Sequence, residues 1–151
     1  MNLTTARAIG GVLMGALGWF VSDLVRPLMP ESTVFGWFNH VNLALGAYVG
    51  WSMLVPKGGQ ASSGNRMVAM SRGLTAAFSL ATIAILAQSV NEMLRLSKRL
   101  RYSDPLKALE DVFRIIADFG VVLLHPTVIG PLIIGSVVIA FIVDMAHSRW
   151  R

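Results

Sequence analysis

The chain contains no cysteine, and its 151 residues include only three histidines. Disulfides, thiolate metal sites, iron–sulfur clusters and cysteine nucleophiles are therefore excluded. Three scattered histidines are too few for a histidine-based metal site, and methionine mostly fills gaps in cores rather than binding metal. No glycine-rich phosphate loop and no Ser/His/Asp arrangement is visible. We therefore expect no metal, no cofactor and no enzymatic activity.

Charge is also scarce, since 14% of the residues are Asp, Glu, Lys or Arg, whereas a soluble domain carries about 25%. Hydrophobic residues make up 54% of the chain, and the mean hydropathy is +0.62. A composition this apolar predicts a polytopic membrane protein. The net charge of +5 then indicates contact with anionic lipid rather than nucleic-acid binding.

Four apolar segments approach the length that a helix needs to cross a bilayer, which is about 20 residues. They cover residues 3–25, 34–55, 68–94 and 121–145. Pro126 and Pro131 lie early in the fourth segment, so its straight part is expected to begin near Thr127. The first segment also resembles a signal peptide, but no small-residue cleavage site follows it, which favours an uncleaved helix. Because backbone polar groups must be satisfied inside lipid, the predicted fold is all-α, with four transmembrane helices in a bundle.

A fifth helix is predicted over residues 105–119. Ser103-Asp104-Pro105 is a helix start, with a capping residue before a proline at the first helical position. Apolar residues then recur at helical spacing, and charged residues occupy much of the remaining surface. This pattern predicts an amphipathic helix lying at the membrane surface. The alternative is an ordinary surface helix packed on the bundle.

Basic residues leave the orientation of the chain open. If all four segments cross the membrane, the two sides carry six and seven Lys and Arg residues, which the positive-inside rule does not separate. The density of one basic cluster favours placing it on the cytoplasmic side. We expect this cluster to contact lipid headgroups, and its members are Arg95, Lys98, Arg99 and Arg101.

Polar residues gather where the first segment ends and the second begins, and polar residues at the edge of a membrane are candidate functional residues. With alternating spans, the end of the third segment lies on the same side. The candidate polar cluster comprises Asp23, Arg26, Glu31, Asn39, His40, Asn42 and Glu92. It is either a pocket with Asp23, His40 and Glu92 as titratable members, or a set of interface anchors and salt bridges. In the second case Glu92 pairs with Arg95 or Arg26.

Two further patterns concern helix faces. A polar stripe on the third segment comprises Arg72, Thr75, Ser79, Thr82 and Ser89. It either lines a solute path or mediates helix packing, as small hydroxylated residues more often do. The spacings Gly11-x-x-x-Gly15 and Gly46-x-x-x-Gly50 allow close helix approach, within the chain or in a dimer.

One block of the sequence is more specific than composition alone would produce. It carries Ala16-Leu17-Gly18-Trp19-Phe20, then Ser22-Asp23-Leu24-Val25-Arg26-Pro27, and then Phe35-Gly36-Trp37-Phe38-Asn39 with Val41-Asn42. With Gly50-Trp51, Gly73-Leu74-Thr75 and Glu92-Met93-Leu94 further on, the chain resembles the TrgA family, small bacterial membrane proteins associated with tellurium (tellurite) resistance. The resemblance implies a multi-pass protein of the bacterial inner membrane. It brings no catalytic or transport residues with it, and the polar members of the block are Asp23, Arg26, Glu31, Asn39 and Asn42.

Three functional hypotheses remain. The first is a contribution to tellurium oxyanion tolerance without catalysis. Because the chain has no cysteine, this contribution cannot be detoxification through its own thiols. The second is a small transporter subunit acting as an oligomer, suggested by the polar cluster and the polar stripe. The third is a structural accessory subunit of a larger membrane complex. The expected partners are the lipid bilayer and either further copies of the chain or such a complex, with no nucleic acid.

Overall fold

The computed structural model describes residues 3–29, 36–55, 65–98 and 104–149. Within these ranges the chain is almost entirely helical and contains no strand. The elements are α1 (Leu3–Val25), a short 3-10 helix η1 (Arg26–Leu28), α2 (Phe38–Met53), α3 (Arg66–Lys98), α4 (Pro105–Leu123) and α5 (Pro126–Arg149). The all-α prediction is confirmed for this part of the chain, and α1 has the predicted bounds.

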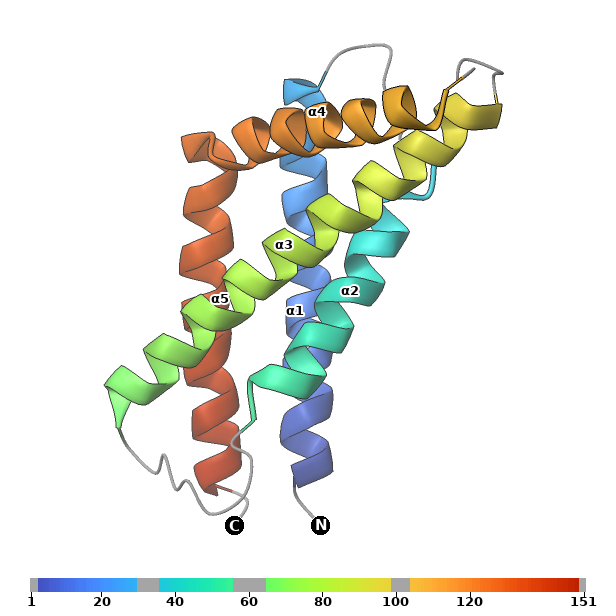
Figure 1. The fold of residues 1–151 in the computed structure, drawn as a ribbon. Coiled ribbons are helices and arrows are strands. Elements are labelled where there is room, and N and C mark those ends of the chain that lie inside the picture. The colour runs from blue at the N-terminus through green and yellow to red at the C-terminus, as the bar shows by residue number, and fades with distance from the viewer. Residues whose placement is uncertain (1–2, 30–35, 56–64, 99–103, 150–151) are drawn as a thin grey trace.

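The helices form a bundle that is crossed at one end by a separate helix (Figure 1). α1 and α2 run antiparallel, α5 lies beside α1, and α3 runs diagonally across the other three. The two chain termini lie at one end of the bundle, and α4 lies across the opposite end. The end of α1, the start of α2, the end of α3 and the start of α5 therefore all lie at the α4 end of the bundle, with the last two at opposite ends of α4 (Figure 1).

Glycines bring the backbones of α1 and α2 into direct contact. A Cβ atom at Gly46 or Gly50 would overlap the carbonyl oxygen of Met14 or Gly10, respectively. On the other helix, a Cβ atom at Gly15 would lie 3.1 Å from a carbonyl oxygen of α2. The prediction that the two small-residue spacings permit close approach is confirmed, and the approach occurs within the chain.

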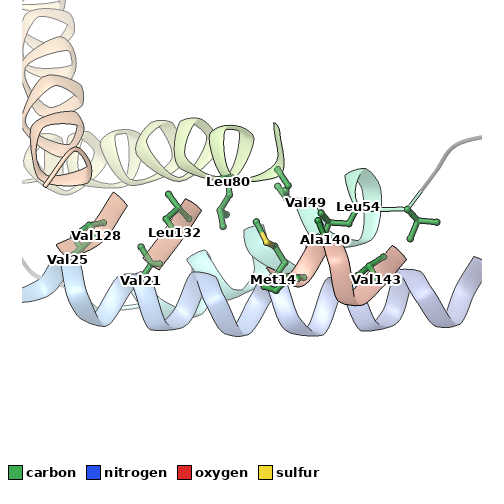
Figure 2. Packing of buried hydrophobic residues seen from close by; sticks show 14 of the residues in the cluster. Met14, Val21, Val25, Val49, Leu54, Leu80, Val128, Leu132, Ala140 and Val143 are labelled. Carbon is green, nitrogen blue, oxygen red and sulfur yellow. The ribbon is translucent and has the colours of Figure 1, made fainter. Parts of the chain in front are cut away.

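The core between these helices is built from apolar side chains of modest size. Met14 of α1, Val49 of α2, and Val128 and Val143 of α5 are each 0% exposed. Figure 2 shows Met14 among side chains from the neighbouring helices, with Leu80 of α3 reaching toward the same interior. α1 thus lies at the centre of the packing and contacts both α2 and α5.

Three stretches of the described chain are long and apolar enough to cross a membrane, which supports a membrane protein. They are Thr5–Leu28, Arg66–Arg95 and Pro126–Ser148. The predicted second span is shorter than expected, because α2 has 16 residues and so extends about 24 Å, against about 30 Å for the hydrocarbon core. The fourth transmembrane helix is therefore not confirmed.

The predicted fourth segment, residues 121–145, starts too early. Residues 121–123 form the last turn of α4, and α5 begins at Pro126. The chain turns at Leu124 and His125, because a proline lacks an N–H group and disfavours helical geometry in the residue before it. The apolar run continues through this corner, so hydropathy alone did not reveal it.

α4 begins where the sequence predicts. The Asp104 side chain accepts a hydrogen bond from the backbone N–H of Leu106 at 3.1 Å, with Pro105 in the first turn. Near the other end of the helix, Phe119 is 8% exposed, and its ring stacks on that of Phe38 at 6.4 Å. Packing on the bundle is therefore confirmed for the second half of α4. The first half leaves three apolar side chains exposed, those of Leu106, Leu109 and Phe113.

Candidate functional site

Neutral polar side chains connect α1, α2 and α3 inside the bundle. Asn42 Nδ2 donates a hydrogen bond to Ser22 Oγ at 2.8 Å, and Ser22 Oγ donates to the carbonyl oxygen of Gly18 at 2.7 Å. Gln88 Nε2 donates to Asn42 Oδ1 at 3.2 Å. All three side chains belong to residues that are at most 8% exposed. We call Ser22, Asn42 and Gln88 the polar junction.

The local sequence explains how the polar junction forms. A Cβ atom at Gly18 would lie 2.5 Å from the carbonyl oxygen of Asn42, so only a glycine lets α2 approach this closely. Ser22 follows one turn later and satisfies its hydroxyl on its own helix. Its oxygen then remains available as the acceptor for Asn42. Because buried polar groups lose energy when they are unpaired, this chain of bonds favours one register of the three helices.

Replacing Asn42 with Ala tests the polar junction. The substitution removes the acceptor of Gln88 and the donor to Ser22, and we expect the free energy of unfolding to fall by about 1 kcal/mol. Reversible unfolding in mixed micelles, followed by circular dichroism, measures this loss. The control is Asn91→Ala, at an exposed position of α3, the helix that also carries Gln88. An equal loss in both variants would contradict the role of the junction.

Asp23, Arg26 and Asn39 meet at the end of the bundle near α4. Asn39 Nδ2 donates to Asp23 Oδ1 at 2.6 Å, and Arg26 Nη1 lies 4.0 Å from the same oxygen. The side chains of Asp23 and Arg26 are 52% and 43% exposed, so this ion pair lies at the surface and stabilises the fold little. Asn39 Oδ1 is enclosed and has no hydrogen-bond partner within the described part of the chain.

The other predicted cluster members lie elsewhere. The His40 ring lies 5.0 Å from that of Trp19 and 5.3 Å from that of Trp37, and Glu92 forms an ion pair with Arg95, as the salt-bridge alternative predicts. Asn42 belongs to the polar junction, and Glu31 lies outside the described residues. Among hydrogen bonds and ion pairs of residues 3–29, 36–55, 65–98 and 104–149, none joins Asp23, His40 and Glu92 to one another.

The predicted polar stripe on α3 does not face a single space. Thr75 and Thr82 are exposed, and their hydroxyls donate to carbonyl oxygens of α3 itself. Ser89 is buried instead, and its hydroxyl has no partner within the described part of the chain. Ser79 is partly buried, whereas Arg72 points to α5. Because α3 crosses the bundle diagonally, positions along one side of it meet different surroundings (Figure 1).

The predicted headgroup contacts of the basic cluster stay a prediction. Arg95 is half-buried and bonded to Glu92. Lys98 is the last residue of α3, and its side chain lies outside the part of the structure that is described. Arg99 and Arg101 lie outside the described residues.

An ion pair between α3 and α5 was not predicted. Arg72 Nη1 lies 3.7 Å from Asp144 Oδ1, and both side chains are 15% exposed. Arg72 Nη2 is enclosed, with no hydrogen-bond partner in the described ranges. The sequence carried a signal for this pair, because opposite charges flank two apolar segments on the same side of the predicted bundle. Ser22 and Gln88 carried no such signal, because neutral polar residues are common in membrane helices.

The described residues contain no group of three or more His, Asp or Glu side chains placed to hold a metal ion. No protein-family model, no curated protein and no solved structure matches the chain. The resemblance to the TrgA family therefore stays a prediction from the sequence, and the polar junction has to be interpreted from its own geometry.

Proposed function

We propose that the chain is a multi-pass protein of a bacterial inner membrane that contributes to tolerance of tellurium oxyanions without catalysing a reaction. The tellurium assignment comes from the sequence resemblance to the TrgA family. The geometry contributes the second half of the proposal, which is that the protein acts through its assembled helices rather than through a reactive group.

The observation that carries the proposal concerns the block from Leu17 to Asn42, which bears the resemblance. Its described residues build the contact between α1 and α2. Asp23, Arg26 and Asn39 are joined to one another, and Asn42 is bonded to Ser22 of α1 and Gln88 of α3. Asn42 lies inside this contact, whereas Asp23 and Arg26 form a pair at the surface. Side chains held in this way position helices, which fits membrane maintenance or partner binding better than catalysis.

The same proposal assigns a membrane arrangement. α2 forms the fourth crossing in its closely packed contact with α1, since Trp37 at its start and Trp51 near its end are exposed and suit the two interfaces. α4 lies in the interface with its charged residues toward water and Leu106, Leu109 and Phe113 toward lipid. Four crossings place both termini on one side, and we assign the α4 side to the cytoplasm because the basic cluster directly precedes α4 in the sequence.

The test is deletion of the gene, followed by growth and cell-associated tellurium measured over a tellurite series. Complementation uses the wild type, Asp23→Asn, Glu92→Gln and, as a control on the exposed face of α4, Glu110→Gln. We expect increased sensitivity with unchanged cellular tellurium and rescue by all four genes, because neither carboxylate moves an ion and each pairs with an arginine three residues away, which adds little stability.

Two outcomes would count against this proposal. Unchanged tolerance after deletion would remove the tellurium assignment. The other outcome is raised cellular tellurium that the wild type and Glu110→Gln correct but Asp23→Asn and Glu92→Gln do not. That result would favour the transporter alternative over a role without transport.

A further inference from the structure

A cleft lies between α3, α4 and α5, within the triangle that these helices outline in Figure 1. α3 and α5 touch where Gly73 packs on Ser136, and they diverge toward α4. The cleft between them has a volume of about 420 Å³, within the range of pockets that hold small molecules. The described residues that form its walls are almost entirely apolar, and the hydroxyl that they include, on Thr82, is already bonded to its own helix.

The cleft adjoins a smaller chamber that polar side chains help to line. Ala81, Ile85, Leu123 and Leu132 line both the cleft and a smaller chamber of about 40 Å³. The polar junction of Ser22, Asn42 and Gln88 lines the same chamber. A chamber of this size holds a small polar group or a few water molecules. The buried amide and hydroxyl groups therefore line a chamber that adjoins the cleft.

The amide of Gln88 has hydrogen-bonding capacity left. An amide nitrogen carries two N–H donors, and Gln88 Nε2 donates one of them to Asn42. Gln88 makes no other hydrogen bond within the described part of the chain. Among the described residues, no Asp, Glu, Lys, Arg or His lines the cleft or the chamber, so a charged ligand would be desolvated without a partner from this part of the chain. The chamber therefore suits a neutral hydrogen-bond acceptor.

The cleft opens toward lipid rather than toward water. Phe78 and Leu74 of α3 and Ile133 of α5 line it and are 75%, 39% and 38% exposed. Both helices contain a stretch that is long and apolar enough to cross a membrane. Acyl chains of the bilayer would therefore lie directly against the opening.

We infer that this cleft binds one uncharged, chain-bearing molecule of the bilayer whose carbonyl group accepts a hydrogen bond from Gln88. The chain lies between α3, α4 and α5, and the carbonyl group enters the chamber. Isoprenoid quinones and fatty acyl esters share this chemistry. The inference goes beyond the proposed role in tellurium tolerance, and because it depends on binding rather than on tolerance, either can fail without the other.

A photolabelling experiment tests the inference on the full chain in lipid nanodiscs. The probe is a fatty acid methyl ester with a diazirine in its chain, and mass spectrometry of peptides locates the label. We expect labelling of peptides that contain residues 74–85 and 120–133, which form the cleft. Competition with a decyl-tailed benzoquinone and with a diacylglycerol distinguishes the two sources of the carbonyl group.

Three variants sharpen the test. Ala81→Phe places a ring where cleft and chamber share a lining residue, and it should abolish specific labelling. Gln88→Leu removes the hydrogen-bond donor and should weaken competition by the carbonyl compounds about fivefold, the effect of one hydrogen bond. Leu86→Phe adds a ring at an exposed position of α3 that lines neither space, and it should label like the wild type. Circular dichroism confirms that each variant is folded.

Two results would overturn the inference. The first is label spread over the lipid-facing surface, with the same pattern in Ala81→Phe as in the wild type. The second is equal competition by decylbenzene and by the benzoquinone, since decylbenzene has the chain and the ring but no carbonyl group. The first result would show that the cleft holds no specific ligand, and the second that Gln88 does not recognise one.

Discussion

Gly50→Ala is expected to be among the most destabilising single substitutions in this chain. The added Cβ atom would overlap the carbonyl oxygen of Gly10 and also lie 2.6 Å from the Cβ atom of Met14. Backbone atoms cannot move aside as a flexible side chain can, so α1 and α2 must separate along their contact. Overpacking of this kind costs about 2 kcal/mol or more, which is a large part of the stability of a typical domain. Reversible unfolding in mixed micelles measures the loss.

Gly120→Ala is the matched control for this prediction. It makes the same chemical change in the last turns of α4, where a Cβ atom would meet nothing within 4 Å. Because Ala has the higher helix propensity, this variant should be as stable as the wild type or slightly more stable. Similar stability of the two variants would mean that the contact between α1 and α2 is not closely packed.

The glycine contact also shows what the sequence could predict. The spacings at Gly11 and Gly15 and at Gly46 and Gly50 already indicated helices that approach closely. A glycine has no side chain, so a neighbouring backbone can lie directly against it. The start of α4 at Asp104 was predictable for the same kind of reason, since a capping side chain and a following proline act within a few residues. Local chemistry of this type does not depend on the rest of the fold.

Segment lengths were harder to predict where the apolar run has no local interruption. The uncharged stretch around α2 continues to Val55, whereas the helix ends at Met53 after 16 residues. The corner at Leu124 and His125 also lies in an apolar run, and there Pro126 is the local signal that marks the start of the next helix. Hydropathy records whether a residue prefers lipid, and it does not record where tertiary packing bends the backbone.

The candidate site could be predicted only in part, because it depends on which helices are neighbours. Asp23, Arg26 and Asn39 meet as their position at one membrane edge suggested. The bonds of Ser22 and Gln88 to Asn42 require the diagonal path of α3, which no feature of the sequence specifies. Neutral side chains that bond across such a crossing resemble any other polar residue in an apolar segment.

Asp144→Asn should cause the largest loss of stability among the charge substitutions. Its carboxylate lies 3.7 Å from Arg72, both side chains are 15% exposed, and removal of the charge leaves a half-enclosed guanidinium without its counter-ion. Breaking a buried ion pair in this way costs about 3 kcal/mol, whereas Asp118→Asn, the same change at an exposed position of α4, should cost less than about 0.5 kcal/mol. Unfolding of both variants in mixed micelles measures the difference.

The double variant Arg72→Met with Asp144→Leu distinguishes an unpaired charge from a lost attraction. It removes both charges and leaves apolar side chains between α3 and α5, and replacing both members of a buried pair in this way is often nearly neutral. We therefore expect the double variant to be more stable than Asp144→Asn, because desolvation of Arg72 no longer opposes folding. If it is instead less stable, the attraction between the two charges outweighs their desolvation, and the ion pair itself holds the crossing of α3 and α5 together.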